Sequence, residues 1–330
     1  MSGTLAPLLE SFFVDRLIRQ QHVSSHTIRG YRDTFRLLLA YAEQTVGKQP
    51  SQLDVTDLDA TFIAGFLTWL ETDRGNTTRT RNMRMAGIRS MFRYASYREP
   101  AHAALIQRVL AIPDKKMHRP VLTFLSPAEI DALLAAPDRT TWIGRRDHAL
   151  LALALQTGLR VSELCGLRCH DLTFGVGAHA RCTGKGRKER CTPLTGHTIS
   201  ILKPWLAELG TIGDTPVFPT RRGGPITADS VGDLVDRHVA TARALCREWT
   251  TGHVTPHTLR HTCAMTLLAA GVDITMIALW LGHENVQTTQ IYLHSDLTMK
   301  QKALDRTTPP GTPPGRYKPP DQLLAFLEAL

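Results

Sequence analysis

Tyr292 lies nine residues after His283, and both follow the tetrad HTLR at residues 257–260. A tyrosine is a weak nucleophile near neutral pH because the pKa of its phenol is about 10. It becomes useful where cationic and hydrogen-bonding groups surround the phosphate that it attacks. Upstream, Arg160 adds a second arginine, and Lys185 lies between two glycines in an expected turn. Two arginines, two histidines, a lysine and a tyrosine in this order indicate a phosphoryl-transfer site that uses no metal.

A metal site is the competing interpretation of the histidines. His253, His257 and His261 recur every four residues, which is a metal-ligand spacing on a helix. Pro256 places His253 before that helix, however, and no Glu follows His257 as the metalloprotease pattern requires. The positive charge of the intervening arginine also repels a divalent cation. We therefore expect neither a metal nor a cofactor.

Composition narrows the class of protein and its partners. The chain has 330 residues, of which 42% are hydrophobic and 21% charged, as is ordinary for a soluble protein of two domains. Its net charge of +9 favours a polyanionic partner. The six cysteines form no CxxC pair, and neither a secretory signal nor a membrane-spanning apolar run is evident. We expect a cytoplasmic protein with no membrane association. Cys182 and Cys191 could face each other across a hairpin, but free thiols fit better.

The first ~115 residues predict four helices and no strand, because their apolar residues recur at helical spacing. The first helix carries the apolar residues between Leu8 and Leu17. Ser25, Asp57 and Asn76 are the expected N-terminal residues of the next three helices.

The fourth predicted helix is strongly basic. Residues 74–98 contain seven arginines and no acidic residue, whereas a merely solvated face would mix both signs. Arginines at helical spacing suit a helix that lies along phosphates. The predicted DNA-contacting residues of this helix are Arg79, Arg81, Arg84, Arg89 and Arg93.

A basic, proline-bounded linker at residues 112–125 separates this region from a second domain. The second domain opens with a capping box from Ser126 to Glu129, with proline as the first helical residue. Thr255 and Pro256 repeat that helix-start pattern, and glycines are the expected helix ends. The expected helices are 127–135, 145–157, 196–209, 228–246, 256–270, 273–281 and 287–294. A hairpin of 180–183 and 189–194 makes the domain mostly α with one small sheet.

Five segments occur in an order typical of one family: TGLRVSEL (157–164), GKGRKE (184–189), HTLRH (257–261), LGH (281–283) and TTQIY (288–292). The chain thereby resembles the tyrosine recombinases, which include the phage integrases and the Xer-type resolvases. The resemblance covers about residues 120–295 closely and the preceding part by architecture. It implies a mainly α protein with a small β-sheet. The implied parts are a four-helix, SAM-like core-binding domain (1–111), the linker (112–125), an α+β catalytic domain (126–300), and a proline-rich spacer with a C-terminal helix (301–330).

The resemblance also implies roles for the charged residues. Arg160 and Arg260 match the two catalytic arginines, whose guanidinium groups grip nonbridging phosphate oxygens. Glu163 either braces these arginines from behind or is a simple carboxylate on a helix surface. Lys185 matches the general acid that protonates the departing 5′-oxygen. Arg187 and Lys188 are its rivals, or else contacts to the DNA backbone.

The remaining matches concern the nucleophile and its neighbours. Tyr292 matches the attacking tyrosine. By resemblance, His257 accepts or relays the tyrosine proton, and His283 donates a hydrogen bond to a phosphate oxygen. His261 and His294 have weaker claims and are interpreted as packing or DNA-proximal residues.

The activity implied is site-specific DNA recombination of the integrase or transposase type, found in mobile elements. A 3′-phosphotyrosyl intermediate conserves the bond energy, so neither ATP nor metal is needed. The implied partners are double-stranded DNA carrying specific sites, three further copies in a tetramer, and a partner recombinase as a further candidate. The implied location is the bacterial nucleoid. A type IB topoisomerase and a catalytically idle DNA-binding regulator are the alternatives. The last ten residues predict a helix that docks on a neighbouring protomer or on its own domain.

Overall fold

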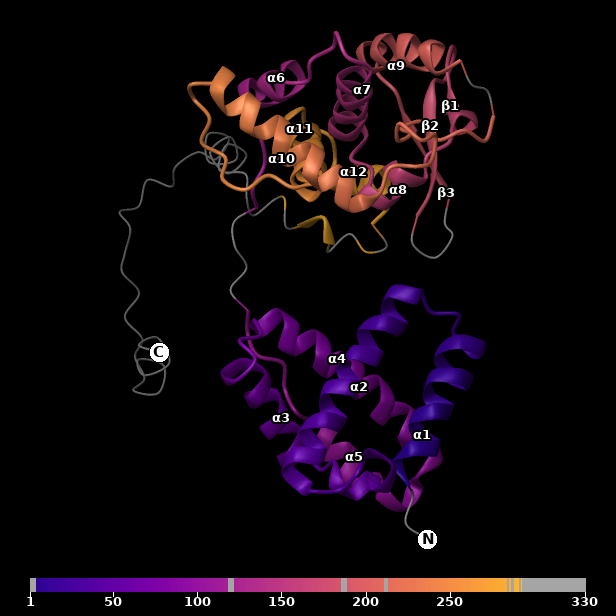
Figure 1. Cartoon of the computed structure of the whole chain (residues 1–330), viewed down its shortest axis with the longest axis vertical. Helices are drawn as coiled ribbons and strands as arrows, with labels where there is room; N and C mark the ends of the chain where they lie inside the picture. The colour runs from indigo at the N-terminus through magenta and orange to yellow at the C-terminus, as the bar shows by residue number, and fades with distance from the viewer. Residues whose placement is uncertain are drawn as a thin grey trace, which may run out of the picture. The chain divides into compact units, whose positions relative to one another are not determined.

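The computed structural model describes most of the chain: residues 4–117, 122–184, 189–210, 213–283, 285, 288–290 and 292. These residues are mainly helical and include one three-stranded antiparallel sheet. The predicted fold class is therefore confirmed. The chain divides into two compact units, residues 1–120 and 121–330, and the division falls within the predicted linker (Figure 1).

The first unit is a bundle of α-helices with no named strand among its described residues. Its buried centre is rich in aromatic side chains, including Phe12, Phe35, Phe66 and Phe92. All four predicted helices are present, and the fifth, α5, was not predicted. The helices are α1 (Leu5–Ser11), which continues as a π-helix (Phe12–Gln20), α2 (Ser25–Val46), α3 (Ala60–Thr72), α4 (Thr78–Arg98) and α5 (Ala103–Leu110).

The capping residues of three helices in this unit differ from the predicted ones by one or two positions. The side chains of Ser24, Asp59 and Thr77 cap α2, α3 and α4, each accepting a backbone N–H of the first turn. Asp57 instead accepts the backbone N–H of Asp54 in a preceding turn. Several capping residues are adjacent in each segment, and packing of the apolar face decides which of them begins the helix.

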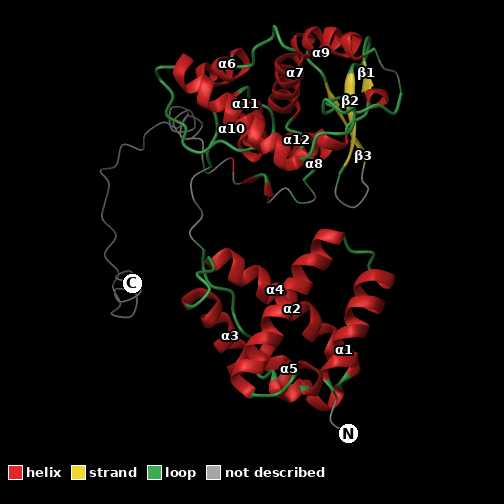
Figure 2. Cartoon of the chain, viewed as in Figure 1, coloured by secondary structure: helices red, strands yellow, loops and turns green. Residues whose placement is uncertain are grey.

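The second unit consists of helices around a large apolar core, with the sheet at one side of the unit (Figure 2). The helix expected to begin at Arg160 is α8, and the short strand β1 was not predicted. The elements are α6 (Pro127–Ala135), α7 (Trp142–Thr157), α8 (Val161–Gly166), β1 (Leu172–Thr173), β2 (His179–Thr183), β3 (Glu189–Pro193), α9 (Gly196–Leu209), α10 (Ala228–Leu245), α11 (Pro256–Ala269) and α12 (Ile274–Leu281).

The register of the hairpin separates its two cysteines. Cys182 pairs with Arg190, and Cys191 pairs with Arg181. Residues directly opposite each other point to the same face of a sheet. Cys182 therefore faces the core while Cys191 is exposed, and both are free thiols.

Three helix ends of the second unit are formed as their sequences predict. Gly158 ends α7 and Gly282 ends α12 in the left-handed conformation, with φ of 62° and 65°. A Cβ atom on Gly158 would lie 2.6 Å from Leu281 Cδ2, so the close approach of these two ends also requires glycine. Thr255 caps α11 and Pro256 is its first residue. The residues expected to do chemistry lie at these ends.

Candidate active site

Arg160 and Glu163 form the first part of the site. Arg160 is the N-cap residue of α8, and its backbone N–H donates to Glu163 Oε2 at 2.7 Å. Arg160 Nη1 donates to Glu163 Oε1 at 3.0 Å, and Nη2 donates to the carbonyl of Gly282 at 3.1 Å. The Glu163 side chain is only 3% exposed, whereas that of Arg160 is 30% exposed. Glu163 is thus a buried partner of Arg160 and not a carboxylate on a helix surface.

Arg190, on β3, was not predicted to belong to the site. Its Nη1 and Nη2 atoms donate to both oxygens of Glu163, each at 2.8 Å. Burial raises the pKa of the Glu163 carboxyl, but the hydrogen bond from Arg190 and the nearby charges outweigh it, so the pKa lies below its ordinary value. The alternation of side chains along the predicted hairpin was the signal in the sequence that could have indicated Arg190. It puts Arg190 on the same face of the sheet as Cys182.

Arg260 is the second arginine of the site and is almost fully buried. Its Nη1 donates to the carbonyl of Gly158 at 2.6 Å and its Nη2 to that of Leu281 at 2.7 Å. Burial and the nearby charge of Arg160 lower the pKa of Arg260 to about 10, so the group stays protonated near neutral pH. Arg160 and Arg260 therefore both attach to the turn at residues 281–283, which ends α12.

Tyr292 is buried beside two histidines. Its side chain is 1% exposed, and burial raises the pKa of its hydroxyl to about 12. The ring of His283 lies parallel to the tyrosine ring, with centroids 6.5 Å apart. His283 Nδ1 shares a 2.7 Å hydrogen bond with Thr289 Oγ1. His261 approaches Tyr292 from α11, and its Nδ1 shares a 3.0 Å hydrogen bond with the tyrosine hydroxyl.

The histidines of this part are held in the neutral form. Burial and then the nearby charge of Arg260 lower the pKa of His257, and the same causes lower that of His283 to about 4. For His261 the causes are burial, then His257 and Arg260, and the pKa falls to about 4. Each imidazole can therefore accept a proton near neutral pH. The sequence predicts His261 to be a packing or DNA-proximal residue, and its contact with Tyr292 could not be read from the sequence.

The structure thus brings together Arg160, Arg260, His283 and Tyr292, with His257 near both arginines. Lys185, Arg187 and Lys188 lie outside the described residues, as do His294 and the predicted C-terminal helix. The predicted helix at 287–294 is described only in part.

The alternative of a metal site at the histidines can be compared with the structure. In the described part of the chain, no group of three or more His, Cys, Asp or Glu side chains is placed to hold a metal ion. The rings of His257 and His261 do lie near each other, with centroids 6.3 Å apart. Their surroundings are cationic, since Arg260 affects both.

The arginines of α4 divide into two groups. Arg79 and Arg93 are exposed, and Arg84 is partly buried. Arg81 is buried and donates to the carbonyl of Pro113. Arg89 donates to the carbonyl of Ile112 and forms an ion pair of 2.9 Å with Asp114.

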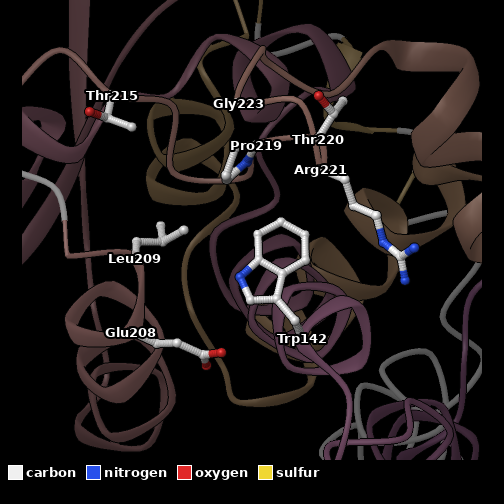
Figure 3. A pocket seen from close by; sticks show the side chains of 8 residues that line it. All are labelled: Trp142, Glu208, Leu209, Thr215, Pro219, Thr220, Arg221 and Gly223. Atoms are coloured by element: carbon white, nitrogen blue, oxygen red, sulfur yellow. The ribbon is translucent and has the colours of Figure 1, made fainter.

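A cavity of about 460 Å³ lies elsewhere in the second unit (Figure 3). It is formed by the start of α7, the end of α9 and the segment 215–223, and none of the site residues lines it. The indole of Trp142 projects into it, opposite Pro219 and Thr220.

In the described part of the chain, no helix is long and apolar enough to cross a membrane.

Comparisons with known proteins identify the family. Residues 123–299 match the phage integrase family, and residues 11–99 match the phage integrase N-terminal SAM-like domain. A protein of Sinorhizobium fredii that is named as an integrase/recombinase is 52% identical over 328 residues, or 99% of each chain. The tyrosine recombinase XerC of Xylella fastidiosa is 32% identical over 306 residues, covering 92% of this chain and 98% of the relative.

A solved structure shares the fold. The XerH site-specific recombinase, in a post-cleavage complex with its palindromic difH substrate, has a TM-score of 0.68 at 23% identity. The match covers 84% of this chain and 79% of that one. Together the matches support the recombinase prediction and not the topoisomerase or regulator alternatives. The chain therefore belongs to the phage integrase family and is a tyrosine recombinase.

Proposed function

We propose that this recombinase cuts and rejoins DNA at specific sites through a 3′-phosphotyrosyl bond to Tyr292. The observation that carries this assignment is the turn at residues 281–283. Both Arg160 and Arg260 are attached to it, and it leads into the segment that holds His283 and Tyr292. The turn thereby connects the two arginines that would bind the phosphate with the segment that carries the nucleophile.

The two arginines bind the scissile phosphate. Each guanidinium has five N–H donors and spends only some of them within the protein, so others remain for nonbridging oxygens. Their charges stabilise the negative charge that grows in the pentacoordinate transition state. Glu163 positions Arg160, and His283 donates a hydrogen bond to a nonbridging phosphate oxygen. Because Tyr292 is almost fully buried, DNA binding has to bring its hydroxyl to the phosphate.

Cleavage forms the Tyr292 Oη–phosphorus bond, passes the phenolic proton to a neighbouring histidine, and breaks the bond from phosphorus to the 5′-oxygen. Lys185 protonates that oxygen, which leaves as a 5′-hydroxyl. Attack by a 5′-hydroxyl from a second duplex releases the tyrosine and rejoins the strands. Arg187 and Lys188 contact the DNA backbone beside Lys185.

The two predicted domains, residues 1–111 and 126–300, both contact the duplex and are joined by the linker at 112–125. Arg79, Arg84 and Arg93 contact phosphates directly. Arg81 and Arg89 act partly through the segment 112–115, which they hold against α4. Exchange between two duplexes requires four protomers, joined by the C-terminal helices, and a partner recombinase can supply two of them. The complex works at chromosomal DNA in the cytoplasm.

The test of the nucleophile is Tyr292→Phe on a nicked target site, in which the released fragment diffuses away. The variant loses one oxygen and should form no covalent adduct on a denaturing gel, while binding DNA almost as well as wild type. Tyr317→Phe, in the proline-rich tail, is the matched control and should form adduct normally. An adduct of normal yield with Tyr292→Phe would remove Tyr292 from the mechanism.

The test of the acid uses the leaving group. Lys185→Ala should cleave ordinary DNA slowly, by about 10²-fold or more. A substrate with sulfur at the 5′-bridging position needs no acid and should recover most of the rate. Lys188→Ala is the control, expected to weaken binding without this recovery. If only Lys188→Ala is rescued, the acid is Lys188.

A further inference from the structure

The hydroxyl of Tyr292 has a specific neighbour, and it is not the histidine expected from the sequence. His261 Nδ1 lies 3.0 Å from Tyr292 Oη, and the two rings meet edge to face with centroids 5.6 Å apart. His257 lies one helical turn earlier on α11, with its ring centroid 6.3 Å from that of His261. Both pairs are within the described residues, and no hydrogen bond joins His257 to Tyr292. Among these described histidines, His261 is therefore the one hydrogen-bonded to the phenol.

The electrostatic surroundings fix the protonation state of both groups before the reaction: His261 is neutral and Tyr292 is protonated. The groups that face His261 are Tyr292, His257, His283 and Arg260. Burial, His257 and Arg260 lower the pKa of His261 to about 4, so its imidazole is neutral and holds a lone pair near neutral pH. Burial raises the pKa of Tyr292 to about 12, so the phenol keeps its proton until the reaction removes it. A phenol of that kind attacks poorly unless a base accepts the proton as the bond forms.

We propose that His261 is a further catalytic residue, the base that takes the proton of Tyr292 as Oη attacks the phosphate. This inference rests on the function proposed above. As the Oη–phosphorus bond forms and the bond to the 5′-oxygen breaks, the proton of Oη passes to Nδ1 of His261, and the 5′-oxygen takes its proton from Lys185. In rejoining, the incoming 5′-hydroxyl gives its proton to Lys185, and His261 returns the first proton to Oη. His257 then either hydrogen-bonds the phosphate or receives the proton from His261.

The experiment uses two chemical rescues in the full-length protein. Nucleophile rescue places a ring-fluorinated tyrosine, whose phenol is more acidic, at position 292 and lessens the need for a base. Leaving-group rescue places sulfur at the 5′-bridging position of the DNA and lessens the need for an acid. His261→Ala should slow adduct formation about 10²-fold. The fluorinated tyrosine should recover at least tenfold of this loss, and the sulfur substrate little.

Lys185→Ala is the matched control and should show the opposite pattern, with rescue by sulfur and little by fluorination. His261→Asn is the second variant, because its amide oxygen still accepts a hydrogen bond but cannot take up a proton. It should fold and bind DNA as wild type does and cleave as slowly as His261→Ala. Circular dichroism and DNA binding check folding in each variant.

Three results would overturn the assignment. Wild-type rates in both His261 variants would leave the histidine without a role in proton transfer. Faster cleavage would show that the hydrogen bond restrains Tyr292 rather than activates it. Slow cleavage in both variants without rescue by the fluorinated tyrosine would assign His261 a structural role. These outcomes leave the proposed function standing, whereas absence of any adduct with wild-type protein would overturn both.

Discussion

Two buried carboxylates of the second unit, Glu163 and Asp147, show how similar ion clusters serve different ends. Asp147 Oδ1 accepts from Nε and Nη2 of Arg146 at 2.9 and 2.7 Å, and its Oδ2 shares a 2.9 Å hydrogen bond with Nε2 of His238. Arg146 also donates to the carbonyl of Pro219. The side chains of Asp147, Arg146 and His238 are 0%, 11% and 9% exposed. This cluster joins α7 to α10, and the exposed Arg237 of α10 also lies 3.8 Å from Asp147 Oδ2.

The carboxylate of Glu163 is also paired with two cations, but one of them is partly exposed to solvent. It is buried between Arg190 and Arg160, and the Arg160 side chain remains 30% exposed. A buried anion can thus fasten two helices together, or it can fix one cation so that the rest of its guanidinium faces a substrate. The difference lies in Arg160: Arg190 is 12% exposed and so as buried as Arg146 at 11%, whereas Arg160 is hydrogen-bonded to the carboxylate and still 30% exposed. Loss of Asp147 should therefore be felt in stability alone, and loss of Glu163 in catalysis as well as in stability.

The largest effect is expected from Asp147→Ala, which leaves Arg146 buried without its anion. Removing one partner of a buried ion pair costs about 3–5 kcal/mol in the free energy of unfolding. Urea titration followed by circular dichroism measures this loss, with Asp236→Ala on the exposed face of α10 as the control. At a temperature where the variant is folded, its cleavage rate per folded molecule should be close to wild type. A strong catalytic defect there would erase the distinction between the clusters.

Glu163→Gln keeps the shape of the side chain and removes its charge. Arg160 should then lose its fixed orientation, and a misplacement of about 1 Å can cost about 10²-fold in rate. Single-turnover adduct formation on a nicked site measures the loss, and urea titration of the same sample measures stability. If Glu163 acts in catalysis, the rate of adduct formation should fall by more than the fraction of unfolded protein accounts for. An unfolding defect as large as that of Asp147→Ala, with a normal rate per folded molecule, would make Glu163 a structural residue as well.

A smaller effect is expected from Arg190→Lys. A lysine keeps the charge but cannot contact both oxygens of Glu163 in the fork geometry of a guanidinium. We expect adduct formation to slow about tenfold, by analogy with loss of one charge-assisted hydrogen bond. Arg181→Lys on β2 is the control, because Arg181 pairs with Asp171 at the exposed side of the same hairpin. Equal effects from the two variants would show that Arg190 has no special part in orienting Arg160.

The smallest effect concerns pH. The pKa of Glu163 is lowered in the folded protein from its ordinary value of 4.5, because Arg190 and the Arg160 backbone outweigh the cost of burial. A group whose pKa is depressed on folding adds stability above its unfolded pKa, and that stability is lost as pH falls through the folded pKa. Wild type should therefore lose stability more steeply below pH 4.5 than Glu163→Gln does. Parallel urea midpoints for the two proteins across this range would contradict the assignment.

Local chemistry in the sequence was enough to place most elements of the second unit. Ser126 and Glu129 form the predicted capping box, and Thr255 with Pro256 begins α11 as expected. Gly158 and Gly282 end their helices because each requires a left-handed backbone that glycine adopts without strain. These signals act within a few residues, so they can be read from the chain alone. The order of the catalytic motifs also indicated the family.

The contacts that give the site its chemistry depend on segments far apart in the chain. Glu163 meets Arg190 across 27 residues, and Arg160 meets the carbonyl of Gly282 across 122. His261 meets Tyr292 because α11 and the segment after α12 pack together, and no spacing in the sequence distinguishes it from His257. The sequence by itself determined which residue types were available and where most helices begin and end. The tertiary structure alone decided which of them touch, because burial and pairing depend on the packing of whole elements.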